Sequence, residues 1–346
     1  MTKKLLFGLN RFDFRSPSQF AANVLRLESA GWDFAFIPCS PLLIKDPYLM
    51  MAEALRCTTT IKLGTLIENP VMRDPAVIAG SIGTLNSMYP ERVLLGMGVG
   101  DTAVRLMGKR PASVQELEKA TTAITALLEG NSLDVDAARP AKMRHSTEPS
   151  HRPPVWIASQ GPKTLRMAGR VADGVFIRVG THPKNIEYAI DQVHQGAKDA
   201  GKQPDDIKIA CIFHTVLEEN PARAKAIARS AAAGYFEYTP SLFKSAGLEW
   251  NGPAVDELRK QVWPDFHHTA DLEAAGNIVS FLDDETANAF SLNGSMDEIR
   301  DQLLGIVDAD LPIDLVIPHP MPTPQAGTEL NRYSDGFSEK IMSNLA

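Results

Sequence analysis

Short apolar runs alternate along the chain with segments in which apolar residues recur at helical spacing. One such segment follows Ser16-Pro17, where Phe20, Val24 and Leu27 share a face before Gly31 ends the pattern. The apolar runs predict eight buried parallel strands at residues 5–9, 34–37, 61–67, 93–97, 155–159, 175–178, 207–213 and 313–317. Strands that alternate with helices in this way predict a (β/α)8 TIM barrel, and a doubly wound open sheet is the alternative.

Residues 234–290 interrupt this rhythm. Aromatic residues and histidines stand there among Gly, Pro and mixed helical stretches, including Trp250, Trp263-Pro264 and His267-His268. A helix at 296–307 and the strand at 313–317 restore the alternation. We therefore predict a single barrel domain over residues 1–346, with an insertion at about 234–290 before the last helix and strand.

Composition narrows the class of protein. At 44% apolar and 22% charged residues, with a net charge of −7, the chain has ordinary globular composition and no basic patch for nucleic acid. No apolar segment approaches the length of a membrane span, and the first run is too short for a signal sequence. Three widely spaced cysteines indicate neither a disulfide framework nor a zinc site, so we expect a cytoplasmic protein. No metal site is expected, because the strand ends offer no paired histidines.

The stretch 154–174 has the pattern of a strand, a tight turn and a helix N-terminus. Ser159, Gln160 and Gly161 follow the apolar run, and Gly161 is expected to permit a turn conformation closed to other residues. Pro162 suits the first helical turn, and Lys163 adds a positive charge to the helix dipole. Such a turn suits a phosphate, and the alternative is an ordinary strand-to-helix connection.

Other strand ends carry candidate site residues, since barrel enzymes place their chemistry there. Asp101 is a candidate for hydrogen bonding or proton transfer, or else a helix cap. Glu68 and Asn69 precede Pro70, which holds Asn69 extended. The glycines at 96, 98 and 100 either let a flat ligand approach or relieve packing at the barrel mouth.

Four further residues complete the strand-end candidates. Ser40 lacks an evident partner for nucleophilic catalysis, and no nucleophile elbow is present. His214 and His319 are possible site residues, although His319, between two prolines, can equally pack beneath the C-terminal tail. Arg178 either serves an anionic ligand group or forms a surface ion pair.

Several motifs together resemble the luciferase-like monooxygenase superfamily, in its methylenetetrahydromethanopterin reductase-like branch. They are Leu63-Gly64-Thr65, Asn69-Pro70, Arg73-Asp74-Pro75-Ala76, Glu91-Arg92-Val93-Leu94-Leu95-Gly96-Met97-Gly98-Val99-Gly100-Asp101, Ala103-Val104, Gly108-Lys109-Arg110-Pro111-Ala112, the stretch 154–174, and Gly294-Ser295 before Asp297-Glu298-Ile299. Each motif is weak by itself, and their combination covers most of the chain outside 234–290.

The resemblance implies a flavin-type cofactor, FMN or coenzyme F420, at the C-terminal mouth of the barrel. Its phosphate would lie on residues 160–163, with Val179 and Gly180 near the phosphate end. Leu66-Ile67 would form a bulge, often with a non-proline cis peptide, and Asn69 and Asp101 would lie near the cofactor. Residues 234–290 would correspond to the variable lid over the substrate. A homodimer is expected, as is a flavin reductase partner if FMN is used.

One departure from the family concerns the end of the second strand. Many relatives have Asp-His or Asp-Ser there, and this chain has Cys39-Ser40. The departure leaves the source of the transferred proton open. Our leading hypothesis is an oxidoreductase that uses reduced FMN with O2, or F420 with hydride transfer, on a small organic substrate. The alternatives are a flavin-free barrel lyase or isomerase with a phosphorylated substrate, and a flavin-binding protein without turnover.

Overall fold

The computed structural model describes residues 4–10, 12, 14–133, 140–145, 151–322 and 328–345. The chain divides into two compact units, and the division falls within β6, α7 and β7. We call residues 6–176 with 192–209 the N-terminal unit. Residues 1–5, 177–191 and 210–346 form the C-terminal unit.

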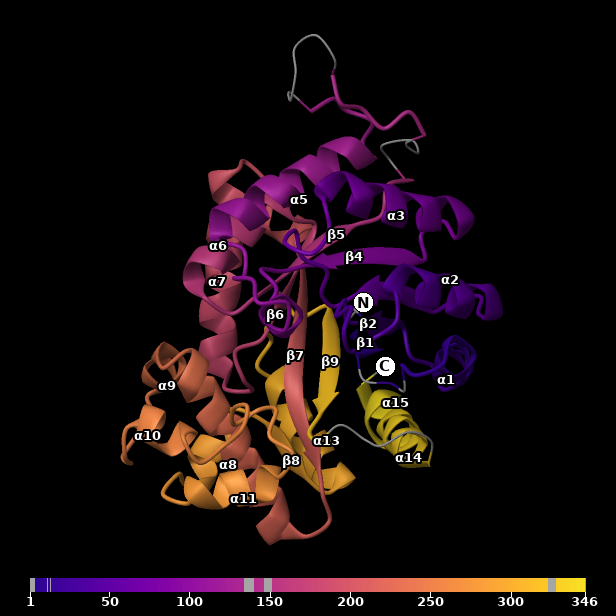
Figure 1. The fold of residues 1–346 in the computed structure, drawn as a ribbon. Coiled ribbons are helices and arrows are strands. Elements are labelled where there is room, and N and C mark those ends of the chain that lie inside the picture. The colour runs from indigo at the N-terminus through magenta and orange to yellow at the C-terminus, as the bar shows by residue number, and fades with distance from the viewer. Residues whose placement is uncertain are drawn as a thin grey trace. The chain divides into compact units, whose positions relative to one another are not determined.

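The N-terminal unit alternates parallel strands with helices (Figure 1). In chain order it contains β1 (Leu6–Leu9), α1 (Pro17–Ser29), β2 (Phe34–Ile37), α2 (Pro47–Cys57), β3 (Lys62–Thr65), α3 (Pro75–Met88), β4 (Val93–Met97), α4 (Thr102–Arg105), α5 (Val114–Leu128), β5 (Val155–Ser159), α6 (Pro162–Val171) and β6 (Gly174–Ile177), then the end of α7 (Pro183–Asp199), η2 (Pro204–Asp206) and the start of β7 (Lys208–Leu217). Its strands are neighbours in the order β1 to β6. The register places Leu63 of β3 beside Val93 of β4, and Leu95 of β4 beside Val155 of β5.

The C-terminal unit is built on β7, which pairs in parallel with β8 (Leu292–Gly294) and β9 (Leu315–Pro320). Between β7 and β8 lie α8 (Pro221–Tyr238), α9 (Ser241–Ala246), α10 (Val255–Arg259), α11 (Leu272–Ile278) and α12 (Asp284–Asn288), grouped in orange in Figure 1. After them come α13 (Met296–Val307), α14 (Thr328–Phe337), η3 (Ser338–Met342) and α15 (Ser343–Leu345). The longest of these helices, α8, buries an alanine-rich face that includes Ala231, Ala232 and Ala233.

The fold class is the predicted (β/α)8 barrel. Four local predictions were wrong. The helix α4 and the strand β8 were missed because four and three residues are too few for a periodic signal. β7 continues to Leu217 and β9 to Pro320, so His214 and His319 lie within strands and not at their ends.

Side-chain caps at helix N-termini and one hydrogen-bonded turn fix the ends of strands in the N-terminal unit. Ser16, Asp46, Asp74 and Ser113 cap α1, α2, α3 and α5 through their side chains. Before β3, Glu28 Oε1 accepts hydrogen bonds from the N–H groups of Thr59 (2.8 Å), Thr60 (2.6 Å) and Ile61 (2.9 Å). Burial raises the pKa of Glu28, but these hydrogen bonds outweigh it and hold the pKa at about 2. The carboxylate therefore fixes the entry to β3, the strand that leads to Asn69.

Candidate active site

Three glycines at alternate positions of β4 and its extension make room for β3 and the residues after it. A Cβ on Gly96 would lie 2.1 Å from the carbonyl oxygen of Thr65, and one on Gly98 would lie 2.2 Å from Cδ1 of Ile67. Gly100 has φ +75°, and a Cβ there would lie 3.0 Å from Cγ of Asn69. The neighbouring segment fills the space beside each glycine. The structure thus supports the packing interpretation of these glycines over close approach by a flat ligand.

The segment after β3 turns sharply at Leu66-Ile67, which is joined by a non-proline cis peptide, as the family resemblance implied. Beyond it, the backbone of Glu68 continues the pairing with β4. Its N–H donates to the Gly96 carbonyl (2.8 Å), and its carbonyl accepts from the Gly98 N–H (2.9 Å). Ile67 and Asn69 are therefore held against the glycine segment, and the Leu66 N–H donates to the Ile37 carbonyl of β2 at 2.8 Å.

The side chain of Glu68 is a buried carboxylate, with 1% of its surface exposed. Its Oε1 accepts from the Asn69 N–H at 2.9 Å, and its Oε2 accepts from the Tyr48 hydroxyl at 3.2 Å. Arg73 Nε lies 3.3 Å from the same Oε2. Burial raises the pKa of Glu68, and these contacts only partly offset that effect. Glu68 thus orients the backbone that carries Asn69.

The position at which this chain departs from its family adjoins the same carboxylate. The Cys39 thiol hydrogen-bonds to Glu68, and burial, followed by the charge of Glu68, raises the pKa of Cys39 well above its usual value. Cys39 is therefore a neutral thiol at physiological pH. Next to it, Ser40 is buried, and its hydroxyl has no hydrogen-bond partner within the described residues. A carboxyl group thus lies close to the end of β2, although the segment after β3 supplies it.

Asn69 and Asp101 differ in their surroundings. Asn69 is 1% exposed, and its Oδ1 accepts from the Met72 N–H at 3.0 Å. Asp101 is the N-cap residue of α4, but its side chain makes no capping hydrogen bond. Instead, it forms an ion pair with Arg105 one turn further on. Its carboxylate is 48% exposed. Packing of Gly100 on Asn69 brings the two loops together, with Asn69 fixed in place and Asp101 accessible.

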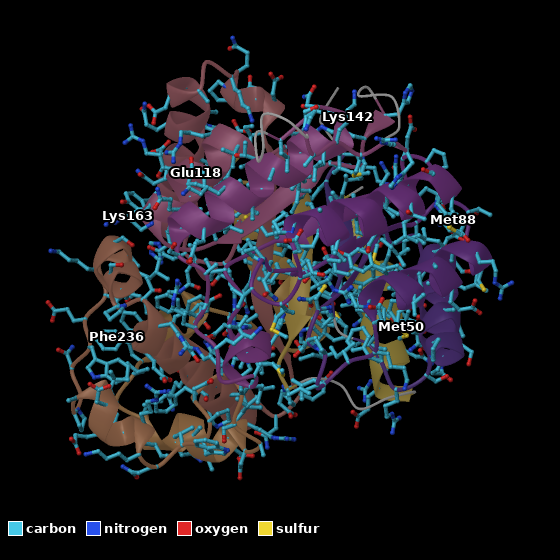
Figure 2. All side chains as sticks on the ribbon, turned by 45° about the horizontal axis from the view of Figure 1, so that its top comes forward. Met50, Met88, Glu118, Lys142, Lys163 and Phe236 are labelled. Atoms are coloured by element: carbon cyan, nitrogen blue, oxygen red, sulfur yellow. The ribbon has the colours of Figure 1, made fainter. Side chains whose placement is uncertain are left out.

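The turn from β5 to α6 is open at the helix N-terminus. Gly161 has φ −88° and ψ 145°, an extended conformation that other residues also adopt, so the predicted glycine-only turn was wrong. A Cβ at Gly161 would meet no atom within 4 Å, and no side chain caps the helix. Pro162 occupies the first turn as predicted, and Lys163 is exposed at the surface (Figure 2). Ser159 is buried at the end of β5. Gly161, Pro162 and Lys163 therefore border open space at the positive end of a helix, with Gln160 half-buried and Ser159 buried behind them.

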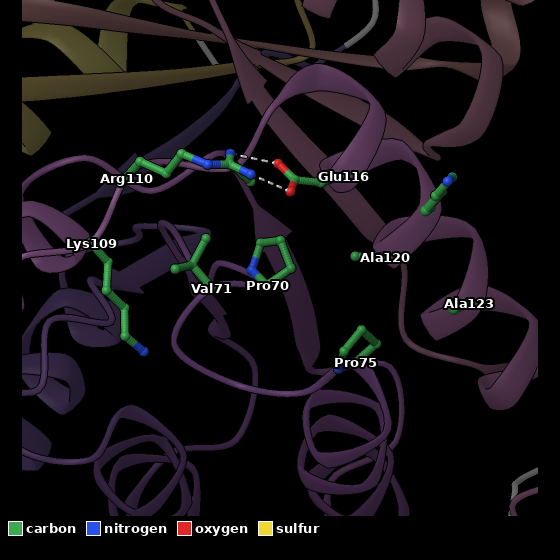
Figure 3. Close-up of a pocket in the computed structure, with 10 residues that line it drawn as sticks. Pro70, Val71, Pro75, Lys109, Arg110, Glu116, Ala120 and Ala123 are labelled. Carbon is green, nitrogen blue, oxygen red and sulfur yellow. Dashed lines mark hydrogen bonds and ion pairs between the residues drawn. The ribbon is translucent and has the colours of Figure 1, made fainter.

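A pocket of about 760 Å³ lies beside the loop that follows Asn69 (Figure 3). Its apolar wall includes Pro70, Val71 and Pro75, and Lys109, Lys119 and Arg110 add positive charge. Glu116 pairs with Arg110 at 2.7 Å and neutralises part of that charge. Local sequence pattern does not predict that Lys109 and Lys119 line one pocket, because only the fold brings α5 and the segment before it beside the loop after β3.

The remaining predicted residues belong to the C-terminal unit. Gly180 has φ +84°, and its Cβ would lie 2.7 Å from the carbonyl oxygen of Ala289. The Val179 carbonyl accepts from Asn185 Nδ2 at 3.3 Å. His319 lies in β9 with its ring centroid 5.1 Å from that of His214.

In the described ranges, His, Cys, Asp and Glu side chains do not gather in a group able to hold a metal ion. None of the described helices is both long and apolar enough to cross a membrane.

Barrel enzymes with a site at the strand ends form a broad class, and comparison with known proteins narrows it. Residues 12–310 match the luciferase-like monooxygenase family. The 5,10-methylenetetrahydromethanopterin reductase of Methanolobus tindarius is 30% identical over 76% of this chain and 79% of its own length. The chain therefore belongs to the luciferase-like monooxygenase family, and it is an oxidoreductase, as predicted.

Two solved structures share the fold. The coenzyme F420-dependent tetrahydromethanopterin reductase from Methanopyrus kandleri matches with a TM-score of 0.74 at 21% identity, over 99% of this chain and 100% of that one. The oxygenating constituent of 3,6-diketocamphane monooxygenase from Pseudomonas putida, in complex with FMN, matches with a TM-score of 0.66 at 16% identity, over 99% of both chains. Proteins that share this fold thus include an F420-dependent reductase and a monooxygenase in complex with FMN.

Proposed function

We propose that the chain binds F420 or FMN with the phosphate group on Gln160, Gly161 and Lys163. The uncapped N-terminus of α6 carries this proposal. It offers unfilled space where a Cβ of Gly161 would stand, the positive end of a helix dipole, and the charge of Lys163. These features fit a phosphate, whereas the other long helices of the N-terminal unit have side-chain caps. Val179 and Gly180 are proposed to lie near the same end of the cofactor.

We infer further that the reaction is hydride transfer with F420 and not oxygenation with FMN. The support is the set of curated relatives, of which the reductase of M. tindarius and that of Archaeoglobus fulgidus, 26% identical over 80% of this chain, are examples. The bound cofactor would supply the hydride. The chain would supply position, water exclusion and proton handling.

Specific roles follow from the contacts. Leu66, Ile67 and Asn69 would hold the ring, because the glycines of β4 and the carboxyl of Glu68 fix that segment rigidly. Asp101 is the accessible carboxylate of the site and is proposed to accept or deliver a proton, with Ser40 and His319 as additional polar groups toward the substrate. Glu68 acts through Asn69 and is a positioning residue.

Residues 234–290, with α9 to α12, are proposed to serve as the substrate lid of a single barrel domain. A homodimer is also proposed, supported by Leu49 on α2 and Val77 on α3, which are 72% and 53% exposed on neighbouring helices. If FMN were the cofactor, a flavin reductase would be needed as a partner.

Titration of the purified protein with F420, FMN and their reduced forms tests the proposal. Binding of F420 at micromolar concentration, with hydride transfer to or from a small substrate, is the expected result. Failure of both cofactors to bind would refute it. Tight FMN binding with O2 consumption would favour oxygenation over hydride transfer as the reaction. Cofactor binding without turnover across a substrate panel would support a non-catalytic role.

A further inference from the structure

Arg178 of the C-terminal unit follows β6 and is half-buried among rings. Its Nη2 lies 2.8 Å from Nε2 of His214 and 3.4 Å from Nδ1 of His267. The guanidinium carbon lies 6.0 Å from the centre of the Tyr235 ring. Within the described part of the chain, Arg178 therefore does not form the surface ion pair that is more common for an arginine.

Both histidines that contact Arg178 are uncharged. An arginine N–H only donates, so each ring nitrogen that faces it must be an acceptor. His267 Nε2 lies 2.9 Å from the Ala231 carbonyl and donates to it, which leaves Nδ1 unprotonated. Burial, followed by the charge of Arg178, lowers the pKa of His267 to about 3. Neutral rings thus surround a fixed positive charge.

No carboxylate of the described residues forms an ion pair with Arg178, and nearby acidic groups have other partners. Asp265 accepts from His268 Nδ1 at 2.8 Å and from the Tyr238 hydroxyl at 2.9 Å. Glu237 pairs with Arg259 at 2.9 Å. In addition, the Nε of Arg178 is buried with no hydrogen-bond partner within the described residues. A buried Nε donor on a charged group is costly when unused, and an anion would satisfy it.

We propose that Arg178, oriented by His214 and His267, binds the carboxylate of a small organic acid through its guanidinium group. A carboxylate presents two oxygens at the spacing of two guanidinium N–H groups, and Nε has a donor to offer. The rings around Arg178 pack against one another, with centroids 5.2 Å apart for Tyr235 and His267 and 5.1 Å apart for His214 and His319, and such aromatic surroundings favour an apolar body on that acid. The inference that an organic acid is the substrate of the enzyme rests on the proposed function. The inference that Arg178 forms a carboxylate-binding site rests on the contacts alone.

Isothermal titration of the full chain with sodium benzoate at low salt, without cofactor, tests the site. Benzoate should bind saturably, and neutral benzamide, which has nearly the same shape, should bind at least about tenfold more weakly. Arg178→Gln should weaken benzoate binding at least about tenfold, and Arg178→Lys should weaken it less because the charge remains. The matched control is Arg223→Gln, which removes an exposed arginine paired with Glu218 in the same unit and should change the affinity by less than about twofold.

Absence of saturable binding by wild type up to about 10 mM benzoate would overturn the proposal. Equal affinities for benzoate and benzamide would do so as well, and that comparison needs no variant, so a misfolded Arg178→Gln protein leaves the test intact. Equal benzoate affinity of wild type and a folded Arg178→Gln protein is the third refuting result. Because no cofactor is present, failure here is separate from failure of the F420 titration.

Discussion

Gly100→Ala and Gly161→Ala add the same methyl group at two turns of the candidate site, and the structure predicts opposite outcomes. Gly100 has φ +75°, which costs a residue with a Cβ about 1–2 kcal/mol. The new Cβ would also lie 2.6 Å from Cγ2 of Val104 and 3.0 Å from Cγ of Asn69. Overpacking of this kind costs about 1–3 kcal/mol. Together these effects predict a loss of about 2–5 kcal/mol in the free energy of unfolding.

At Gly161 neither cost applies. The backbone is already extended, and an added Cβ has no atom within 4 Å. Alanine is a poorer N-cap than glycine, but it also restricts the unfolded chain, and these effects of about 0.5–1 kcal/mol oppose each other. Gly161→Ala should therefore stay within about 1 kcal/mol of wild type.

Urea unfolding followed by tryptophan fluorescence measures both values from the shift in midpoint at a common slope. Unfolding free energies of the two variants that agree within about 0.5 kcal/mol would refute the argument from conformation and space. A second measurement concerns function. Gly161→Ala should weaken F420 binding despite its normal stability, because the methyl group enters the space assigned to the phosphate. Unchanged affinity would place the phosphate elsewhere.

Three further predictions concern charge. Lys163→Glu should weaken cofactor binding at least about tenfold, as measured by fluorescence titration. Lys184→Glu on α7 is a control with the same change in charge. Equal cofactor affinities of the two variants would contradict a role for Lys163 in binding. Glu28→Gln should cost about 2 kcal/mol at pH 7, a value discounted for partial exposure. The pKa of Glu28 is about 2 in the folded state, below the unfolded value of 4.5, so wild type should lose this stabilisation as the pH falls from about 4.5 to about 2. Acid unfolding curves that coincide for wild type and Glu28→Gln would contradict this expectation. The pKa of His267 is lowered to about 3 from 6.5, so the unfolded state takes up its proton first and stability should fall as pH drops below 6.5, by about 1 kcal/mol at pH 5.5. His267→Gln should abolish that part of the pH dependence in urea unfolding between pH 8 and 5.5, and an unaltered slope would argue against a buried neutral imidazole.

Local pattern was enough to predict the fold class and most elements of the chain. The apolar run at 155–159 coincides with β5, and the helix predicted at 296–307 coincides with α13. These predictions were accurate because strand and helix periodicity, together with Pro and Ser at helix starts, act over a few neighbouring residues. β8 and α4 were missed because three- and four-residue elements depend on pairing and packing with distant segments.

The sequence by itself also determined which loops carry polar groups, since parallel strands direct their ends to one side. It did not determine what those groups touch. Three of the contacts described above join residues that are separated by many positions in the chain. They are the burial of the Glu68 carboxyl beside Cys39, the packing of Gly100 on Asn69, and the neutral rings around Arg178. Only the tertiary structure brings such residues within contact distance and removes water from between them, and burial of that kind is what shifts pKa values and leaves a donor free for a ligand.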